Sequence, residues 1–261
     1  MSLYPQLDPV RPAQKGPGAD WRALARHWLR RLAKAVFVVA ILTVLWRFFY
    51  PIYSWRQKIE VTVSTPQGKV SGSSVMAVTW GDSPDILPDP PHVYHHSSGE
   101  AVVMELPGNR HLFALMTNSD SLALRVFGKD KFPKQTPYAT DSLLPAAEEV
   151  NGHFGETRSL TPDQYPLLVT FGDINDPASV RRVDPANLAA SFGAGYRLEG
   201  ITITITDEPL TEGKVEAVLG WWTKYVDSKH RMISLRYPNS SPRGYDTLTP
   251  LDFWSLNNIP K

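Results

Sequence analysis

The residues best suited to chemistry gather between Asp82 and His96. Three histidines, His92, His95 and His96, follow aspartates at positions 82, 85 and 89. Imidazole and carboxylate groups are ligands for zinc and copper. The spacing matches no zinc motif, and the HExxH pattern is absent from the sequence. In an extended segment His92 and His96 share one face while His95 points away, so the pattern favours a solvated loop over a metal site.

A second polar group lies in FGDINDP, at 171–177, where Asp173, Asn175 and Asp176 offer hard oxygen ligands suited to calcium. Asp-x-Asn-Asp is similar to the linker motif of cadherins, but Pro177 stands where that motif continues with asparagine. The segment is not an EF-hand loop, because the glycine at the sixth position is missing. Aspartate and asparagine also cap their own backbone, and this favours a structural turn after a buried strand.

Other catalytic groups do not assemble into a recognisable pattern. The chain has no cysteine and no Gly-x-Ser-x-Gly elbow. Glu105 and the pair Glu148-Glu149 are carboxylates of the kind that glycosidases use, but any β-rich domain of this size carries such acids. Trp222 fits a core stripe, and Trp221 is expected off that stripe as a candidate partner surface. We therefore expect no catalysis and no cofactor; the alternative is an envelope hydrolase or metal-dependent enzyme that uses the Asp82–His96 loop.

Alternating patterns predict the strands that would position these residues. In the segment 58–65, KIEVTVST, apolar residues alternate with polar ones, which indicates a half-buried strand. A Pro-Gln-Gly turn predicts a hairpin to a second strand at 75–80. A second hairpin is predicted for 101–106 and 112–116, around Pro-Gly-Asn-Arg. Further strands are expected at 167–171, 201–205 and 232–237.

Short helices complete the predicted domain. They are expected near 143–150, after Asp184-Pro185, and along an apolar stripe from Val215 to Val226. The stretch 117–160 otherwise reads as a long irregular excursion. Parallel βαβ repetition is absent, which argues against dinucleotide and P-loop folds. The sequence therefore predicts a mainly β domain with a few short helices (α+β), arranged as an antiparallel sandwich over residues 57–261.

The uncharged run Ala35–Trp46, AVFVVAILTVLW, predicts a membrane span when it is extended from Leu32 to Tyr53, since a span needs about 20 residues. Lys34 and Arg47 can extend their charges toward opposite headgroup layers. An amphipathic helix lying on the membrane is the alternative, but this run is apolar on every face. The residues expected at the membrane interface are Lys34, Trp46, Arg47, Tyr50, Tyr53 and Trp55.

Charge predicts the orientation of this span. Residues 1–34 carry seven Lys and Arg against two acids, whereas residues 58–261 carry 18 against 24. Short positive flanks stay cytoplasmic, and no Ala-x-Ala cleavage site follows the apolar run. We expect a disordered cytoplasmic tail (1–20), a basic flank with a signal anchor (21–55) and a periplasmic or extracellular domain. The inner membrane of a bacterium fits the absence of cysteine, and an acidic outer domain argues against nucleic acid.

Three segments carry a resemblance to a known family: RQKIEVTVSTPQGKVSGSSV, GEAVVMEL with LFALM, and YPLLVTFGDINDPASVRRVDP with GITITITDEPLT. Over about 56–210 they resemble an uncharacterised family of single-pass membrane-anchored bacterial proteins, which implies the anchored architecture and no assigned activity. TPQGKVSGSSV is also similar to the first hairpin of carboxypeptidase-regulatory-like Ig sandwiches, which supports the fold alone. We expect an anchored binding or scaffolding protein whose partners are the lipid bilayer and a protein of the cell envelope.

Overall fold

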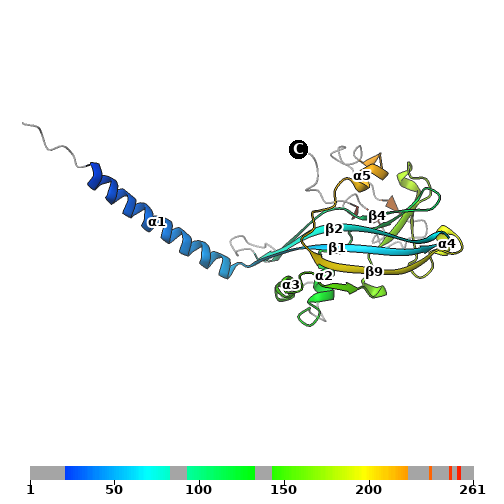
Figure 1. Ribbon diagram of the computed structural model, residues 1–261, viewed down its shortest axis with the longest axis horizontal. Helices are drawn as coiled ribbons and strands as arrows, with labels where there is room; N and C mark the ends of the chain where they lie inside the picture. Colours follow the sequence, from blue (N-terminus) through cyan, green and yellow to red (C-terminus); the bar gives the residue numbers. More distant parts are fainter. Residues whose placement is uncertain are drawn as a thin grey trace, which may run out of the picture. The chain divides into compact units, whose positions relative to one another are not determined.

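The computed structural model describes residues 21–82, 93–132, 143–222, 235–236, 247–248 and 252–253. The chain divides into two compact units, with the boundary between Phe49 and Tyr50. The first unit contains helix α1 (Trp21–Phe49), and the second contains every strand of the described chain (Figure 1). The boundary therefore falls before Tyr53 and Trp55, which the sequence had assigned to the anchor.

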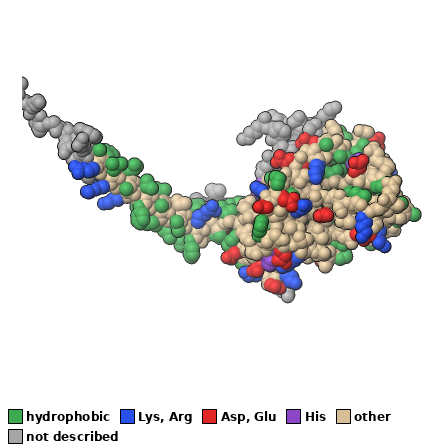
Figure 2. Space-filling model, in the orientation of Figure 1, with side chains coloured by type: hydrophobic (Ala, Val, Ile, Leu, Met, Phe, Trp, Pro, Cys, Tyr) green, Lys and Arg blue, Asp and Glu red, His purple; other side chains and the backbone are tan. Residues whose placement is uncertain are grey.

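Helix α1 is long and apolar enough to cross a membrane. The segment Trp28–Phe49 has 22 residues, a mean hydropathy of 2.0 and no buried part. Apolar side chains surround this segment, and basic side chains gather toward its N-terminal part (Figure 2). Pro51 follows two residues after the helix. Since proline cannot donate to a helical hydrogen bond, it suits a helix that ends at Phe49.

The first sheet contains five strands in the order β3-β2-β1-β9-β6, and every neighbouring pair is antiparallel. Its strands are β1 (Ile52–Thr65), β2 (Gly68–Asp82), β3 (Val93–Ser98), β6 (Thr157–Ser159) and β9 (Arg197–Thr206). The predicted first hairpin is confirmed, with Thr65 opposite Gly68. Gly68 has a φ of 126°, a conformation that glycine adopts without steric cost. Both hairpin strands are longer than the sequence pattern predicted.

Strand β1 shows how the alternation divides the first sheet into two faces. Ile59, Val61 and Val63 are buried, each with at most 1% of its surface exposed. The same face continues back through Gln57 and Trp55, which are also buried. The opposite face is polar, and hydroxyl pairs such as Thr62–Ser71 and Ser54–Thr79 are 2.9 Å apart across β1 and β2. One face therefore packs into the core, and the other meets solvent.

The second sheet has four antiparallel strands in the order β4-β5-β7-β8. They are β4 (Val102–Leu106), β5 (Arg110–Ala114), β7 (Leu168–Phe171) and β8 (Val180–Arg182). The predicted hairpin between β4 and β5 is confirmed, and its turn contains Gly108 and Asn109 with positive φ. A separate pair joins β10 (Leu235–Arg236) to β11 (Thr247–Leu248), inside the predicted last-strand region for β10.

Two hydrophobic cores lie on the two faces of the second sheet. The main core joins Met104 and Leu112 of this sheet to residues such as Ile59 and Met76 of the first sheet. The second core contains Phe113 together with a group from later in the chain: Val215, Leu219, Trp222 and Phe253. The expected fold class, mainly β with a few short helices and sandwich-like, is confirmed (Figure 1).

The helices of the domain agree only in part with the sequence patterns. The helix predicted near 143–150 is confirmed as α3 (Leu144–Asn151). Helix α2 (Ser119–Phe127) was missed inside the stretch interpreted as irregular; packing on the sheets buries most of it. Helix α5 (Lys214–Val218) is shorter than predicted, although Leu219 and Trp222 continue its buried face. The remaining short helices are η2 (Pro162–Gln164), η3 (Pro177–Ser179) and α4 (Ala189–Phe192).

Candidate functional site

The histidines of the 82–96 region do not form a metal site within the described residues. His92, Asp85 and Asp89 lie outside those residues, while His95 and His96 are neighbours in β3 and therefore point to opposite faces. His95 Nδ1 is 2.8 Å from Asp120 Oδ2, and its ring stacks on Trp80 with 4.9 Å between ring centroids. Across the described chain, no three His, Asp or Glu side chains lie close enough together to hold an ion. His95 thus connects β3 to the start of α2.

The acidic loop after β7 is a structural turn, as the sequence favoured. Asp173 Oδ1 accepts the N–H of Asn175 at 2.9 Å, and Asp176 Oδ1 accepts the N–H of Ala178 at 2.9 Å. Ser179 also donates its hydroxyl hydrogen to backbone carbonyls of this loop. The aspartate oxygens therefore cap the backbone of their own turn, and the three proposed calcium ligands have a structural explanation.

The paired tryptophans both contribute to packing. Trp222 is 2% exposed and belongs to the second core, as predicted. Trp221 is partly buried: its indole N–H donates to the carbonyl oxygen of Ile174 at 2.8 Å, and its ring meets Phe171 edge-on at 5.9 Å. The expectation that Trp221 is an exposed partner surface is therefore wrong.

The residues expected at a membrane interface separate into two groups. Lys34, Trp46 and Arg47 lie on α1 with exposed side chains, and Tyr50 directly follows the helix. Tyr53 and Trp55 lie in β1. Trp55 is 6% exposed and its indole N–H donates to Gln57 Oε1 at 3.1 Å, so the interfacial assignment of Trp55 is wrong. Its ring belongs to the core of the domain.

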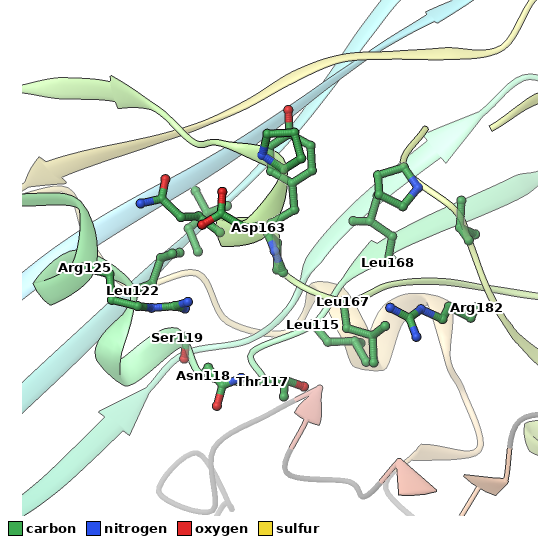
Figure 3. Close-up of a pocket in the computed structure, with 17 residues that line it drawn as sticks. Leu115, Thr117, Asn118, Ser119, Leu122, Arg125, Asp163, Leu167, Leu168 and Arg182 are labelled. Atoms are coloured by element: carbon green, nitrogen blue, oxygen red, sulfur yellow. The ribbon is translucent and has the colours of Figure 1, made fainter. Parts of the chain in front are cut away.

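A cavity of about 230 Å³, which no sequence pattern indicates, opens beside the start of α2 (Figure 3). Four separate parts of the chain form it: Ile59, residues 115–125, residues 162–168 and residues 182–185. Its apolar side includes Leu115, Leu122 and Leu168, each buried in the domain. Prolines at positions 162, 166 and 185 stiffen the surrounding backbone. The cavity is therefore preformed and partly apolar, as ligand sites commonly are.

Buried polar contacts hold α2 beside this cavity. The Nε2 group of Gln57, a residue with 0% exposure, donates to the carbonyl oxygen of Ser119 at 2.7 Å. Trp80 Nε1 donates to the carbonyl oxygen of Asp120 at 2.9 Å. Together with the contact between His95 and Asp120, these bonds attach the first turn of α2 to three points on the first sheet. Because α2 also carries Arg125, the same contacts position that guanidinium.

Two arginines give the cavity its charge. Figure 3 shows Arg125 and Arg182 extending from opposite sides toward its middle, with Leu115 and Leu167 between them. Arg125 Nε is buried and has no hydrogen-bond partner. Asp163 also lines the cavity, and a hydrogen bond from Thr161 lowers its pKa, with a smaller contribution from the charge of Arg125. The aspartate is thus ionised and already hydrogen-bonded.

Arg158, close to α2, is an arginine whose donors form hydrogen bonds within the domain. Arg158 Nε donates to Glu156 at 2.7 Å, and Arg158 Nη1 donates to the carbonyl oxygen of Val126 at 2.8 Å. The hydrogen bond from Arg158, followed by one from His153, lowers the pKa of Glu156. The guanidinium of Arg158 also lies over the ring of Phe127. Its donors are therefore used within the fold, in contrast to the buried Nε of Arg125.

Arg125 and Arg182 are distant in the chain and share no motif, so the sequence does not indicate that they line one cavity. The available signal was the pair Pro162 and Pro166, which indicates a stiff loop before strand β7. Comparisons of the chain with models of protein families, with curated protein sequences and with solved structures found no match. The chemistry of this cavity therefore follows from its own residues alone.

Proposed function

We propose that this chain is a single-pass membrane protein of the bacterial inner membrane that presents a non-enzymatic binding domain to the cell envelope. Its N-terminus is cytoplasmic, and the β-rich domain lies on the outer side as a module that binds or positions another envelope component. The observation that carries the proposal is α1, a fully exposed apolar helix of sufficient length, joined through Tyr50 and Pro51 to a domain with its own cores.

Charge supports this orientation. The residues before the apolar run have a net charge of +5, from seven Lys and Arg and two acids, and those after residue 57 have a net charge of −6, from 18 and 24. Retention of positive flanks in the cytoplasm then directs the domain outward. Lys34, Trp46, Arg47 and Tyr50 would lie near the two membrane surfaces, where long basic stems and aromatic rings are favourable.

Exposed apolar side chains give a second line of support. In the described part of the domain, the large apolar residues with the greatest exposure are Ile52 (43%), Tyr94 (39%) and Phe154 (65%). Ile52 and Tyr94 both pair with Gly81 in the first sheet, and Phe154 lines a cavity with residues near the start of β1. All three thus lie at the end of the sheet that the chain enters from α1, where contact with lipid headgroups would explain their exposure.

Reporter fusions test the orientation. Alkaline phosphatase, which is active only outside the cytoplasm, should be active when fused after Lys261 and inactive when fused before Met1. Green fluorescent protein should give the opposite result at the same two positions. Phosphatase activity from the N-terminal fusion alone would overturn the proposed orientation.

In-cell cross-linking tests the binding role. A photoreactive amino acid replaces Pro162, which is exposed at the edge of the 230 Å³ cavity. The matched control position is Thr62, on the polar face of the first sheet. We expect a discrete cross-linked product from position 162 and none from position 62. Absence of any product from position 162, at normal expression of the full chain, would contradict the proposal that this region contacts an envelope component.

A further inference from the structure

We propose that the cavity between Arg125 and Arg182 binds a carboxylate that carries a small apolar group. The inference deepens the binding role proposed above and rests on it. Two guanidinium groups enter one cavity from opposite sides (Figure 3). Among the described residues, neither forms an ion pair or side-chain hydrogen bond, and Arg125 Nε is buried without a partner. Guanidinium groups match carboxylates in charge and in the geometry of their N–H donors.

Arg125 is partly exposed, but its Nε is buried without a hydrogen-bond partner, and a ligand would account for this donor. Buried polar groups in folded proteins are nearly always hydrogen-bonded, so each exception requires an explanation. Arg125 Nε is one of three such exceptions among the described side chains. It is the one of the three that belongs to a permanently charged group lining a cavity. A bound anion would satisfy this donor.

The neighbouring Asp163 does not neutralise the site. Its carboxylate already accepts a hydrogen bond from Thr161, and no ion pair joins it to Arg125 within 4.0 Å in the described chain. Two arginines against one aspartate leave the cavity with a net positive charge. This charge is embedded in a domain that is acidic overall. Such a local reversal of sign favours an anionic ligand at this position.

The apolar side of the cavity selects among anions. Leu115, Leu122 and Leu168 line the cavity, and Leu167 beside them is partly exposed, so an apolar group would find contacts there that a bare phosphate or sulfate cannot make. A carboxylate with a branched aliphatic group would meet the arginines with one end and the leucines with the other. The volume of about 230 Å³ suits a group the size of one amino-acid residue. Two sources share this chemistry: a free small acid and the C-terminal residue of a peptide.

Calorimetric titration of the purified full chain in detergent micelles tests the proposal. The probes are N-acetyl-leucine, its uncharged amide, the peptide acetyl-Ala-Ala-Leu with a free carboxylate, and inorganic phosphate. We expect binding of the acids and at least ten-fold weaker binding of the amide and of phosphate. Tighter binding of the peptide than of N-acetyl-leucine assigns the source as a chain end, and the reverse assigns it as a free acid. Equal binding of acid and amide, or no binding of either acid at millimolar concentration, overturns the proposal.

Three substitutions locate the site. Arg125→Gln and Arg182→Gln should each weaken binding of the preferred acid by about ten-fold to a hundred-fold, because each removes a charge-assisted contact. Arg181→Gln is the matched control, since Arg181 precedes Arg182 in β8 and points to the opposite face. Arg182 is exposed, so its variant should fold even if the Arg125 variant does not. An equal loss of binding in the Arg181 and Arg182 variants overturns the assignment.

The cross-linking experiment separates this inference from the proposed function. Cross-linked products from position 162 without any binding of the acids would refute the carboxylate site and leave the binding role intact. Binding of the acids without cross-linked products would support the site and contradict the role in contacting an envelope component. The absence of both would overturn both.

Discussion

Glu100 is a buried carboxylate whose replacement should release α5 from the second sheet. The side chain is 0% exposed. Its Oε2 accepts the N–H of Val215 at 2.7 Å, and its Oε1 accepts the N–H of Lys214 at 3.1 Å. These N–H groups are at the start of α5, where no helical carbonyl is available to accept them. Glu100 therefore supplies the acceptors that this helix lacks.

The size of the effect follows from these two bonds. A hydrogen bond to a charged group contributes about 1.5–3 kcal/mol, so Glu100→Ala should lower the free energy of unfolding by about 3–6 kcal/mol. Glu100→Gln keeps one acceptor oxygen and places an amide group against the second N–H. It also removes the cost of burying a charge, so we expect a smaller loss of about 1–3 kcal/mol.

Urea unfolding of the full chain in detergent, followed by tryptophan fluorescence, measures this loss. Trp222 lies in the second core and reports on the region that α5 covers. Glu105→Gln is the matched control, because Glu105 is an exposed glutamate of β4 in the same sheet; it should change the free energy of unfolding by less than about 0.5 kcal/mol. If Glu100→Gln and Glu105→Gln have the same effect, the reasoning about buried acceptors is refuted.

Three further predictions concern polar groups of the sheets. Hydrogen bonds from Ser64 and from two cationic side chains lower the pKa of Glu199 from 4.5 to about 2. The stabilisation by Glu199 is therefore present above pH 4.5 and is lost as the pH falls toward 2. In thermal melts, Glu199→Gln should lower the melting temperature at pH 5, and this difference should disappear near pH 2. Burial lowers the pKa of His111 below 6.5, so the unfolded chain binds this proton first and the fold loses stability as the pH falls below 6.5. In thermal melts over the same pH range, His111→Leu should lose less stability than the unaltered chain. An equal pH dependence of the two would contradict this. Gln57→Leu leaves a buried indole N–H without its acceptor and should cost about 1–3 kcal/mol in urea unfolding, whereas the same change at exposed Gln67 should be nearly neutral.

The strands were predictable because their side chains alternate over several residues. In β9, Ile201, Ile203 and Ile205 are buried and the threonines between them are partly exposed, and this is the pattern that the sequence displays. The turns were equally predictable, because Gly68 and Gly108 occupy the positions that have positive φ. The local sequence pattern was therefore sufficient to predict the hairpins and the class of fold.

Helix α2 and the start of β1 were not predictable in the same way. In β1, polar Gln57 interrupts the apolar face, so Trp55 was grouped with the aromatic residues near the anchor rather than with Ile59. The structure accommodates Gln57 through contacts to Trp55 and Ser119. Helix α2 begins after Asn118, which has a φ of 58° and forms no side-chain cap. Its helical state depends on packing with distant residues, and such contacts leave no local pattern.

The cavity was beyond prediction for a related reason. Its two arginines come from α2 and β8, and neither is near a motif. The sequence offered two candidate clusters, one at 82–96 that includes His95 and one at 171–177 that includes Asp173, and within each cluster the polar residues are close together in the chain. Their proximity reflected turn formation and a contact between β3 and α2. Clustering along a sequence is therefore a poor guide to a site assembled by tertiary structure.

The second core has a consequence for the order of folding during synthesis. The N–H of Ala101 donates to the carbonyl oxygen of Phe253 at 2.8 Å, and the N–H of Met116 donates to that of Asp252 at 2.7 Å. The β1–β2 hairpin needs only adjacent residues and can form as soon as it emerges, whereas these contacts must wait for a long loop to close. Until residue 253 emerges, the apolar face around Phe113 lacks part of its cover. During that interval the growing chain exposes this apolar face, and chaperones would be needed to keep it from aggregating.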